Sequence, residues 1–421
     1  MYVQAETPSG VVRGRRDSFG ELYQAVPYAA APIGPGRFLP PSPHPGWSGV
    51  RDGTRAGPTA PQPVRDFSGL DMTPYFGPGW ARGDEYLTVD VRTPAADDGR
   101  RPVMVFVHGG GFVTGSARAA LYDGRAFARD GVVLVKVNYR LGVPGFLDLA
   151  GTPPNRGLLD VLAALGWVRD TIAVFGGDPG NVTVFGQSAG ATLTGALLAT
   201  PEAKGMVHRA IIQSGSGTGA FTPEQAARVT AAAASALGTE PTARAFGELP
   251  DERFVEILPA LAGLDLRTEN AGDPLAGLSP FSLVSPVQPA DGPLDGDVAL
   301  LIGTNTEEGN LYGRPDLGHT LFGAGTERLA RAHARISDGH THRYSFGHRS
   351  TALNGRLGAA HTVELPFVFD VAGEPWLHGE AGLLGPDPAP EGLAARMHGA
   401  WVAFARTGDP GWSAGTVEFF G

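Results

Sequence analysis

The chain contains no cysteine and comparatively little charge. The absence of cysteine from its 421 residues excludes disulfides, thiolate metal sites and cysteine nucleophiles. Charged residues make up 18% of the chain and hydrophobic residues 42%, so there is enough apolar material for a large core. The net charge of -10 argues against nucleic acid or an anionic membrane as a partner.

Long apolar runs are absent as well. No stretch reaches the roughly 18–20 apolar residues of a membrane-spanning helix, so no span is predicted. The N-terminal segment, MYVQAETPSG, has no basic start followed by an apolar run. This predicts no signal peptide and therefore a cytoplasmic location, although a secreted form with its leader removed would look the same. We expect a monomer or a weak homo-oligomer.

Apolar, β-branched runs alternate with helical patterns after residue 100. Residues 102–108 (PVMVFVH) and 132–138 (VVLVKVN) are typical of strands buried on both faces. Further buried strands are predicted at 182–186, 208–213 and 298–303. Helices are predicted at 158–175, 189–199, 223–237, 251–262, 325–335 and 391–407. Residues 1–100 contain only short apolar pieces and predict a small β region. The alternation indicates an α/β fold with a doubly wound, mostly parallel sheet.

The strongest motif is Gly186-Gln187-Ser188-Ala189-Gly190. This G-x-S-x-G follows a predicted strand and precedes a predicted helix, which is the setting of a nucleophile elbow. The turn is so tight that glycine is needed two residues on either side of the serine. The alternative is a chance match in a chain with 62 glycines, but the strand before it and the helix after it favour the elbow.

A glycine run, His108-Gly109-Gly110-Gly111, follows the predicted strand 102–108. Consecutive glycines leave backbone N–H groups free to point at a substrate oxyanion. A flexible turn is the plain alternative, and a phosphate cradle is disfavoured because no G-K-[ST] follows.

The chain resembles the type-B carboxylesterase and cholinesterase family, including its bacterial, para-nitrobenzyl-esterase-like members. Residues 175–190 (FGGDPGNVTVFGQSAG) fit that family's serine signature. Similar landmarks occur near both ends and in the middle of the chain. They are 26–38, 84–91, 103–115, 137–148, 155–160, 212–216, 302–309, 358–369 and 401–410. The resemblance implies a single α/β-hydrolase domain over 1–421 with an abbreviated helical lid, whose insertions are 217–297 and 310–340.

The resemblance also implies a site. It makes Ser188 the nucleophile, and it makes His361 the base because this histidine occupies the Gly-x-x-His segment. The acid precedes glycine in the strand-end motif, which selects Glu308 over Glu307. The implied oxyanion donors are the N–H groups of Gly110, Gly111 and Ala189. Without the resemblance, the paired glutamates would be interpreted as a solvated strand end. His340 and His342 could share a face of a strand near a metal, but a solvated loop is favoured.

The resemblance further implies two structural ion pairs, Arg140 with Asp160 and Arg37 with Asp84. The lid segments are short and rich in Gly, Ala and Pro, so we expect few bulky side chains above Ser188 and a wide, shallow mouth. Gln187 stands where cholinesterases carry glutamate, which argues against a preference for choline esters.

The implied activity is hydrolysis of small-molecule carboxylic esters by a serine carboxylesterase, through a Ser-His-Glu triad and an acyl-enzyme, with no cofactor and no metal. Short- to medium-chain acyl groups and broad alcohol groups are expected. Two alternatives stay open. One is an adhesion or binding module that has kept the fold, and the other is the same machinery acting on amides, carbamates or thioesters.

Overall fold

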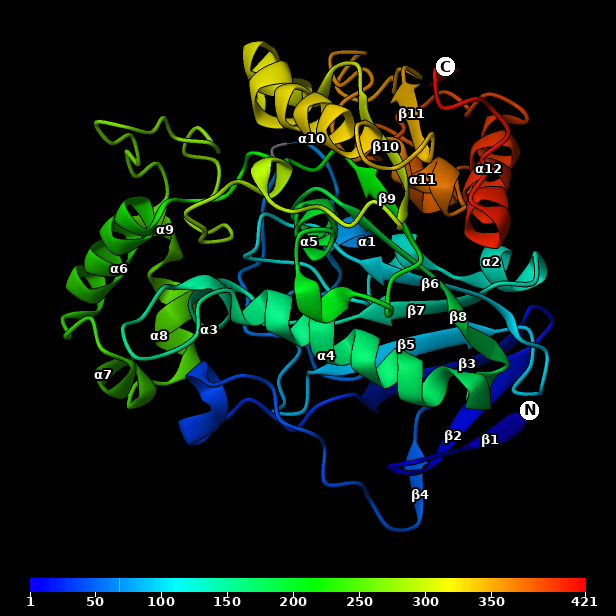
Figure 1. Cartoon of the computed structure of the whole chain (residues 1–421), viewed down its shortest axis with the longest axis horizontal. Coiled ribbons are helices and arrows are strands. Elements are labelled where there is room, and N and C mark those ends of the chain that lie inside the picture. The colour runs from blue at the N-terminus through cyan, green and yellow to red at the C-terminus, as the bar shows by residue number, and fades with distance from the viewer. Residues whose placement is uncertain (68) are drawn as a thin grey trace.

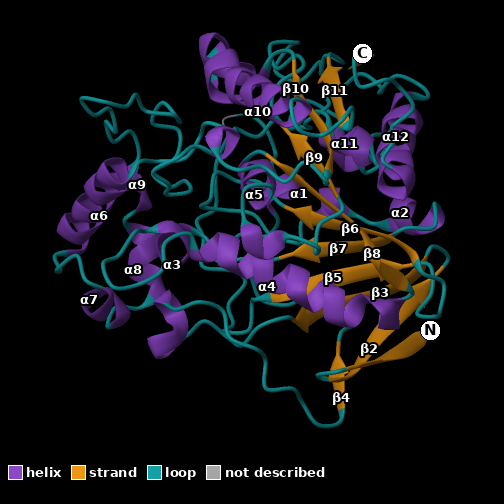
Figure 2. Cartoon of the chain, in the orientation of Figure 1, coloured by secondary structure: helices purple, strands orange, loops and turns teal. Residues whose placement is uncertain are grey.

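A twelve-stranded mixed sheet forms the centre of the molecule in the computed structural model, which describes residues 1–67 and 69–421 (Figures 1 and 2). Its N-terminal strands are β1 (Tyr2–Thr7), β2 (Gly10–Asp17), β3 (Gly20–Pro27) and β4 (Val50–Asp52). The others are β5 (Thr88–Thr93), β6 (Arg101–Val107), β7 (Val133–Val137), β8 (Gly177–Gln187), β9 (Arg209–Gln213), β10 (Ala299–Asn305), β11 (Thr341–Phe346) and β12 (Val417–Phe420).

The sheet changes from antiparallel to parallel along its width. The strand order is β1-β2-β3-β5-β7-β6-β8-β9-β10-β11-β12, and β4 pairs with β2. The pairs from β1 to β7 along this order are antiparallel, while every pair from β7 to β12 is parallel. This confirms the predicted mostly parallel centre and the small N-terminal β region. The carboxyl ends of the parallel strands therefore meet at one edge, where such sheets place their sites.

Helices cover both faces of the sheet, as Figure 2 shows. They are α1 (Thr73–Phe76), α2 (Arg125–Arg129), α3 (Gly142–Phe146), α4 (Arg156–Thr171), α5 (Ala189–Leu197), α6 (Pro223–Leu237), α7 (Ala243–Gly247), α8 (Asp251–Glu256), α9 (Leu258–Leu261), α10 (Ala324–Ala334), α11 (Leu365–Val368) and α12 (Leu393–Thr407). Within residues 1–67 and 69–421, no helix has both the length and the apolar character needed to cross a membrane.

Two apolar clusters form the core, one on each face. On β6, Val103, Val105 and Val107 pack on the face covered by α4, α5 and α10, whereas Met104 and Phe106 pack on the face of α2, α11 and α12. In Figure 1, α4 runs across the front of the sheet. The continuous apolar run of β6 thus reflects burial on both faces.

Helices α4 and α6 form where the sequence predicts them, because apolar spacing and capping residues favour helix there. In α4, the three-to-four spacing that predicted the helix buries Val161, Leu165 and Val168 and leaves Arg169 and Asp170 exposed. Helix α6 begins at a capping box and ends at a left-handed glycine, which explains why its predicted bounds are matched.

The insertion segments occupy two places. Residues 217–297 carry α6 to α9, which lie beside the sheet at the left of Figure 1. In 310–340, α10 connects the parallel strands β10 and β11, while the turns before it border the pocket described below. The division into one body with two lid insertions stays a prediction.

One expected loop is a strand. The preference for a solvated loop around His340 and His342 is wrong, because β11 begins at Thr341 and is hydrogen-bonded between β10 and β12. His342 is buried, and its Nδ1 lies 3.0 Å from the carbonyl oxygen of Trp412, while His340 is exposed. The strand sequence THRYSF is mostly polar, so its hydrophobicity pattern does not predict that the strand is buried.

The first predicted ion pair is present and fully buried. Nη2 and Nε of Arg140 lie 2.7 and 2.8 Å from the two carboxylate oxygens of Asp160, and both side chains are 0% exposed. The Arg140 Nη1 group donates to the carbonyls of Arg37 and Leu39. The pair therefore ties β7 and α4 to the N-terminal loops.

The second predicted pair is wrong. Arg37 pairs with Asp251 of α8, with Nε 3.3 Å from Oδ1, and Asp84 is exposed. Burial raises the pKa of Asp251 despite the opposing effect of Arg37. Asp251 is far from Arg37 in sequence, so only the packing of α8 against the N-terminal loops creates this contact.

We predict that Asp160→Ala lowers the free energy of unfolding by about 3–5 kcal/mol, because it leaves the Arg140 guanidinium buried without its partner. Urea unfolding measures this loss. The matched control is Asp170→Ala on the same helix, whose partner Arg169 is exposed, and it should cost less than about 1 kcal/mol. Equal losses in the two variants would contradict a special role for the buried pair.

Candidate active site

Ser188 occupies a strained turn between β8 and α5. Its φ of 58° and ψ of −124° lie outside the regions that side-chain-bearing residues favour. A Cβ added at Gly186 would lie 2.5 Å from the backbone of Gly190, and one added at Gly190 would clash with the carbonyl oxygen of Val107. The two flanking glycines are therefore required by backbone contacts, as the elbow interpretation of the sequence expects.

His361 and Glu308 lie in contact behind the serine. Nδ1 of His361 is 2.6 Å from Oε2 of Glu308, and both side chains are at most 3% exposed. The other oxygen, Oε1, accepts hydrogen bonds from Ser214 Oγ at 2.5 Å and from the N–H of Asn305 at 2.7 Å. These two donors fix the carboxylate, which in turn fixes the imidazole with its Nε2 directed away from Glu308.

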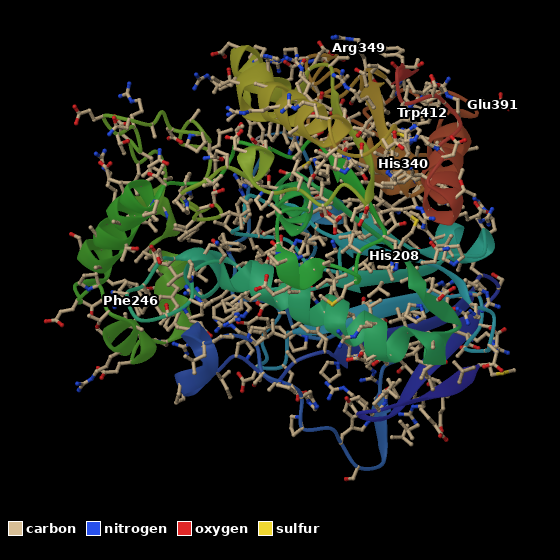
Figure 3. All side chains as sticks on the ribbon, in the orientation of Figure 1. His208, Phe246, His340, Arg349, Glu391 and Trp412 are labelled. Atoms are coloured by element: carbon tan, nitrogen blue, oxygen red, sulfur yellow. The ribbon has the colours of Figure 1, made fainter. Side chains whose placement is uncertain are left out.

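Glu307 points elsewhere. Its carboxylate pairs with Arg349 and accepts the N–H of Ala359 at 2.9 Å. Arg349 lies at the outer edge of the molecule (Figure 3). The structure thus brings Glu308 to His361 and turns Glu307 toward the surface, which is the arrangement that the predicted roles require.

The serine and the histidine open onto the same pocket. Nε2 of His361 lies 3.3 Å from Nε2 of Gln187, whose Oε1 accepts the Tyr75 hydroxyl at 2.6 Å. Within the described residues, no hydrogen bond joins Ser188 Oγ to His361. In unliganded sites such bonds are often long and shorten when substrate binds.

Free backbone donors face the same space. Gly110 and Gly111 have φ values of 111° and 62°, which glycine adopts without strain. Within residues 1–67 and 69–421, the N–H groups of Gly110, Gly111 and Ala189 donate to no protein acceptor. All three residues line the pocket, so a substrate oxygen there would meet unpaired donors.

The pocket is about 670 Å³, including its open mouth, and is lined mainly by apolar and aromatic side chains. Phe112 lines it near the predicted oxyanion donors, and Phe322 stacks on the His361 ring with centroids 4.2 Å apart. The expectation of few bulky side chains above Ser188 is wrong. The segments expected to form the lid supply Leu275, Leu278, Leu311, Tyr312, Leu321 and Phe322.

Sequence reasoning assigned no role to Glu364, which is 0% exposed. Asn305 Nδ2 donates to its Oε2 at 2.7 Å, and Gln213 Nε2 lies 3.4 Å from its Oε1. Burial, followed by repulsion from Glu308, raises the pKa of Glu364 to about 7. Its position three residues after His361 was the available signal, but only the fold reveals that both carboxyl groups share one buried network.

Metal ligation has no support in the described part of the chain. There, no group of three or more His, Asp or Glu side chains is arranged to hold a metal ion.

Comparisons with known proteins identify the family of the chain. The profile described as "Carboxylesterase family" matches residues 2–314. The chain is also 34% identical to phenmedipham hydrolase of Pseudarthrobacter oxydans, over 96% of this chain and 90% of that protein. The chain belongs to the carboxylesterase family. As a carboxylesterase it is a carboxylic-ester hydrolase, and the predicted enzyme class is confirmed.

Other carboxylesterases show the same relationship. Para-nitrobenzyl esterase of Bacillus subtilis (strain 168) is 33% identical over 96% of this chain and 90% of its own length. The crystal structure of a Geobacillus stearothermophilus carboxylesterase superimposes with a TM-score of 0.80, at 32% identity, over 97% of this chain and 91% of that one. A thermophilic para-nitrobenzyl esterase structure gives a TM-score of 0.83 at 30% identity. The predicted α/β-hydrolase fold is confirmed.

We predict that Glu308→Gln lowers kcat by about 10⁴-fold, because an amide facing Nδ1 favours the wrong histidine tautomer. Glu307→Gln is the matched control, since its carboxylate faces Arg349, and its loss should be far smaller. Steady-state kinetics on a chromogenic ester with folded, purified variants measures both. The reverse ranking would overturn the assignment of the acid.

The raised pKa of Glu364 predicts a pH-dependent stability. The folded chain holds this proton up to about pH 7, whereas the unfolded chain releases it at the ordinary carboxyl pKa. The folded state therefore binds more protons between these values, and stability falls as pH rises. Glutamine has no proton to release, so between pH 5 and pH 8 the free energy of unfolding of Glu364→Gln should rise by about 2–3 kcal/mol relative to that of the parent.

Urea unfolding of both proteins at the two pH values measures this gain. Glu307→Gln again provides the control, because the Ala359 N–H and Arg349 outweigh partial burial and lower the pKa of Glu307. Relative to the parent, the free energy of unfolding of Glu307→Gln should fall as pH rises, and this change should occur at lower pH than the gain of Glu364→Gln. A pH-independent difference for Glu364→Gln would contradict the buried, protonated carboxyl.

Proposed function

We propose that the protein is a serine carboxylesterase that hydrolyses short- to medium-chain esters with varied alcohol groups. Ser188 is the nucleophile, His361 the base and Glu308 the acid that orients the base. The observation that carries the proposal is the convergence on one pocket of a strained serine, a histidine held by a buried carboxylate and three unpaired N–H groups. A cytoplasmic location and a monomeric or weakly oligomeric state stay sequence-based predictions.

The reaction proceeds in two halves. In the first, His361 Nε2 takes the Ser188 proton while Oγ bonds to the ester carbonyl carbon. The oxyanion accepts hydrogen bonds from Gly110, Gly111 and Ala189, each contributing about 2.7–4 kcal/mol to the barrier reduction. The bond to the alcohol oxygen then breaks, and Nε2 returns the proton to the leaving alkoxide.

In the second half, water hydrolyses the acyl-enzyme. Nε2 removes a proton from water as the water oxygen attacks the acyl carbon, and then protonates Ser188 Oγ as the acid leaves. Glu308 stays ionised and stabilises the imidazolium in both halves. No cofactor takes part in these steps.

Two other functions are tested by simple measurements. A binding module that kept the fold would not turn over a chromogenic short-chain ester, nor would it react with a fluorophosphonate at Ser188. The relatives named phenmedipham hydrolase and para-nitrobenzyl esterase suggest phenmedipham and para-nitrobenzyl esters as further probes of substrate type. Relative kcat/KM on esters, amides, carbamates and thioesters then ranks the possible leaving groups.

We predict that Ser188→Ala abolishes ester turnover while the thermal midpoint stays close to that of the parent, because its side chain opens onto the pocket. Burst kinetics with the parent enzyme detect the acyl-enzyme. The matched control is Ser216→Ala, which alters another pocket serine whose hydroxyl contacts Thr218 and no proposed catalytic group, and it should keep most of the parental turnover. If the Ser188 variant kept parental turnover, another nucleophile would have to act.

Substrate choice is expected to be broad. Each buried methylene contributes about 0.8 kcal/mol, so kcat/KM should rise about fourfold per acyl carbon until the acyl chain fills the pocket of about 670 Å³, and then level off. Neutral Gln187 offers no anion next to the serine, so choline esters should have no advantage over neutral isosteres. The measurement is kcat/KM from acetyl to dodecanoyl esters. A steep rise through dodecanoyl, or a strong choline preference, would contradict this range.

A further inference from the structure

Arg65 is the one permanent cation among the residues that line the pocket, and no carboxylate side chain lines it. Its side chain is half-buried. Within the described residues, no ion pair or hydrogen bond joins its guanidinium to another side chain or to the backbone, and the adjacent Asp66 is exposed. The proposed ester hydrolysis assigns no role to this charge.

The guanidinium is held beside the predicted oxyanion donors. Its Nη1 would lie 3.5 Å from a Cβ added at Gly111. Its Cζ lies 5.1 Å from the ring centroid of Phe67 and 5.9 Å from that of Phe76, and these two rings stack on each other. Cation–π contacts of this kind keep an arginine against an apolar wall while its N–H groups stay available.

The segment that carries Arg65 is fixed to the oxyanion loop. Three residues earlier, Gln62 accepts the N–H of Gly115 and the hydroxyl of Thr114, each at 2.8 Å. Gln62 also donates to the Gly115 carbonyl at 3.1 Å. Gln62 is buried, so the backbone that carries Arg65 is held against the glycine loop.

We propose that Arg65 selects esters that carry a carboxylate a few bonds from the reacting carbonyl. This rests on the proposed function, and it assigns a substrate class to the same site. A substrate carboxylate would meet a guanidinium that has no carboxylate partner among the described residues, in a largely apolar pocket where charge-assisted hydrogen bonds are strong. The chain as a whole carries a net charge of -10 and repels anions, so any preference for them must come from a local cation.

The carboxylate can sit on either side of the ester bond, and the test has one arm for each. The acyl arm compares mono-4-nitrophenyl adipate with its methyl ester. The alcohol arm compares 4-carboxyphenyl butyrate with its methyl ester. The quantity measured is the ratio of kcat/KM for the anionic ester to that for the neutral ester, after subtraction of the uncatalysed rate.

In at least one arm, Arg65→Gln should lower this ratio by about 10- to 100-fold, the effect of losing one hydrogen bond to a charged group. Taking the same ratio in parent and variant cancels the intrinsic reactivity of each ester. Most of the change should appear in KM, Arg65→Lys should keep part of the selectivity, and added salt should weaken it. Arg244→Gln removes an exposed arginine, and with the same change in net charge it should leave the ratio at the parental value.

Ratios that are unchanged by Arg65→Gln in both arms would overturn the inference. So would equal losses on anionic and neutral esters, which would indicate a general effect on the oxyanion or on folding. The proposed function fails separately, if the parent enzyme hydrolyses none of the neutral esters.

Discussion

The turn between β8 and α5 packs so closely on the end of β6 that only glycine fits at Gly190. A Cβ there would clash with the carbonyl oxygen of Val107, the last residue of β6. The residues that follow Val107 carry the proposed oxyanion donors, so this contact makes neighbours of two segments between which the chain forms β7, α4 and β8. Ser188 and the N–H groups proposed as oxyanion donors are therefore positioned together by one backbone contact, and the strain at Ser188 is maintained by the packing around it.

Behind the serine, the site is a buried network of polar groups. Glu308 is held by Ser214 and Asn305, and Asn305 also donates to Glu364. Two carboxyl groups share this network, and burial together with their repulsion keeps Glu364 protonated up to about pH 7. The apolar core on both sides of the sheet provides the stability that this polar cluster does not.

The front of the site has a different character. Apolar and aromatic side chains form most of the pocket wall, and many of them come from the turns after β10 and from residues 275–279. Short insertions can still enclose a pocket when their bulky residues point inward. Among the described residues that line this wall, Arg65 is the one permanent cation.

The sequence by itself determined the features that depend on near neighbours in the chain. The elbow, the glycine run, the buried strands 102–108 and 132–138 and the capped helix 223–237 all follow from local sterics, periodicity and capping. The proposed acid and base were assigned through motifs of the family resemblance, since spacing alone left Glu307 and Glu308 equivalent. Tertiary structure decided which side chains meet across long separations. Arg37 pairs with Asp251 because α8 packs against the N-terminal loops, β11 is buried despite its polar sequence, and Glu364 and Arg65 acquire their surroundings only when the chain is folded. A side chain's partner depends on packing between distant segments, and no local pattern encodes that contact.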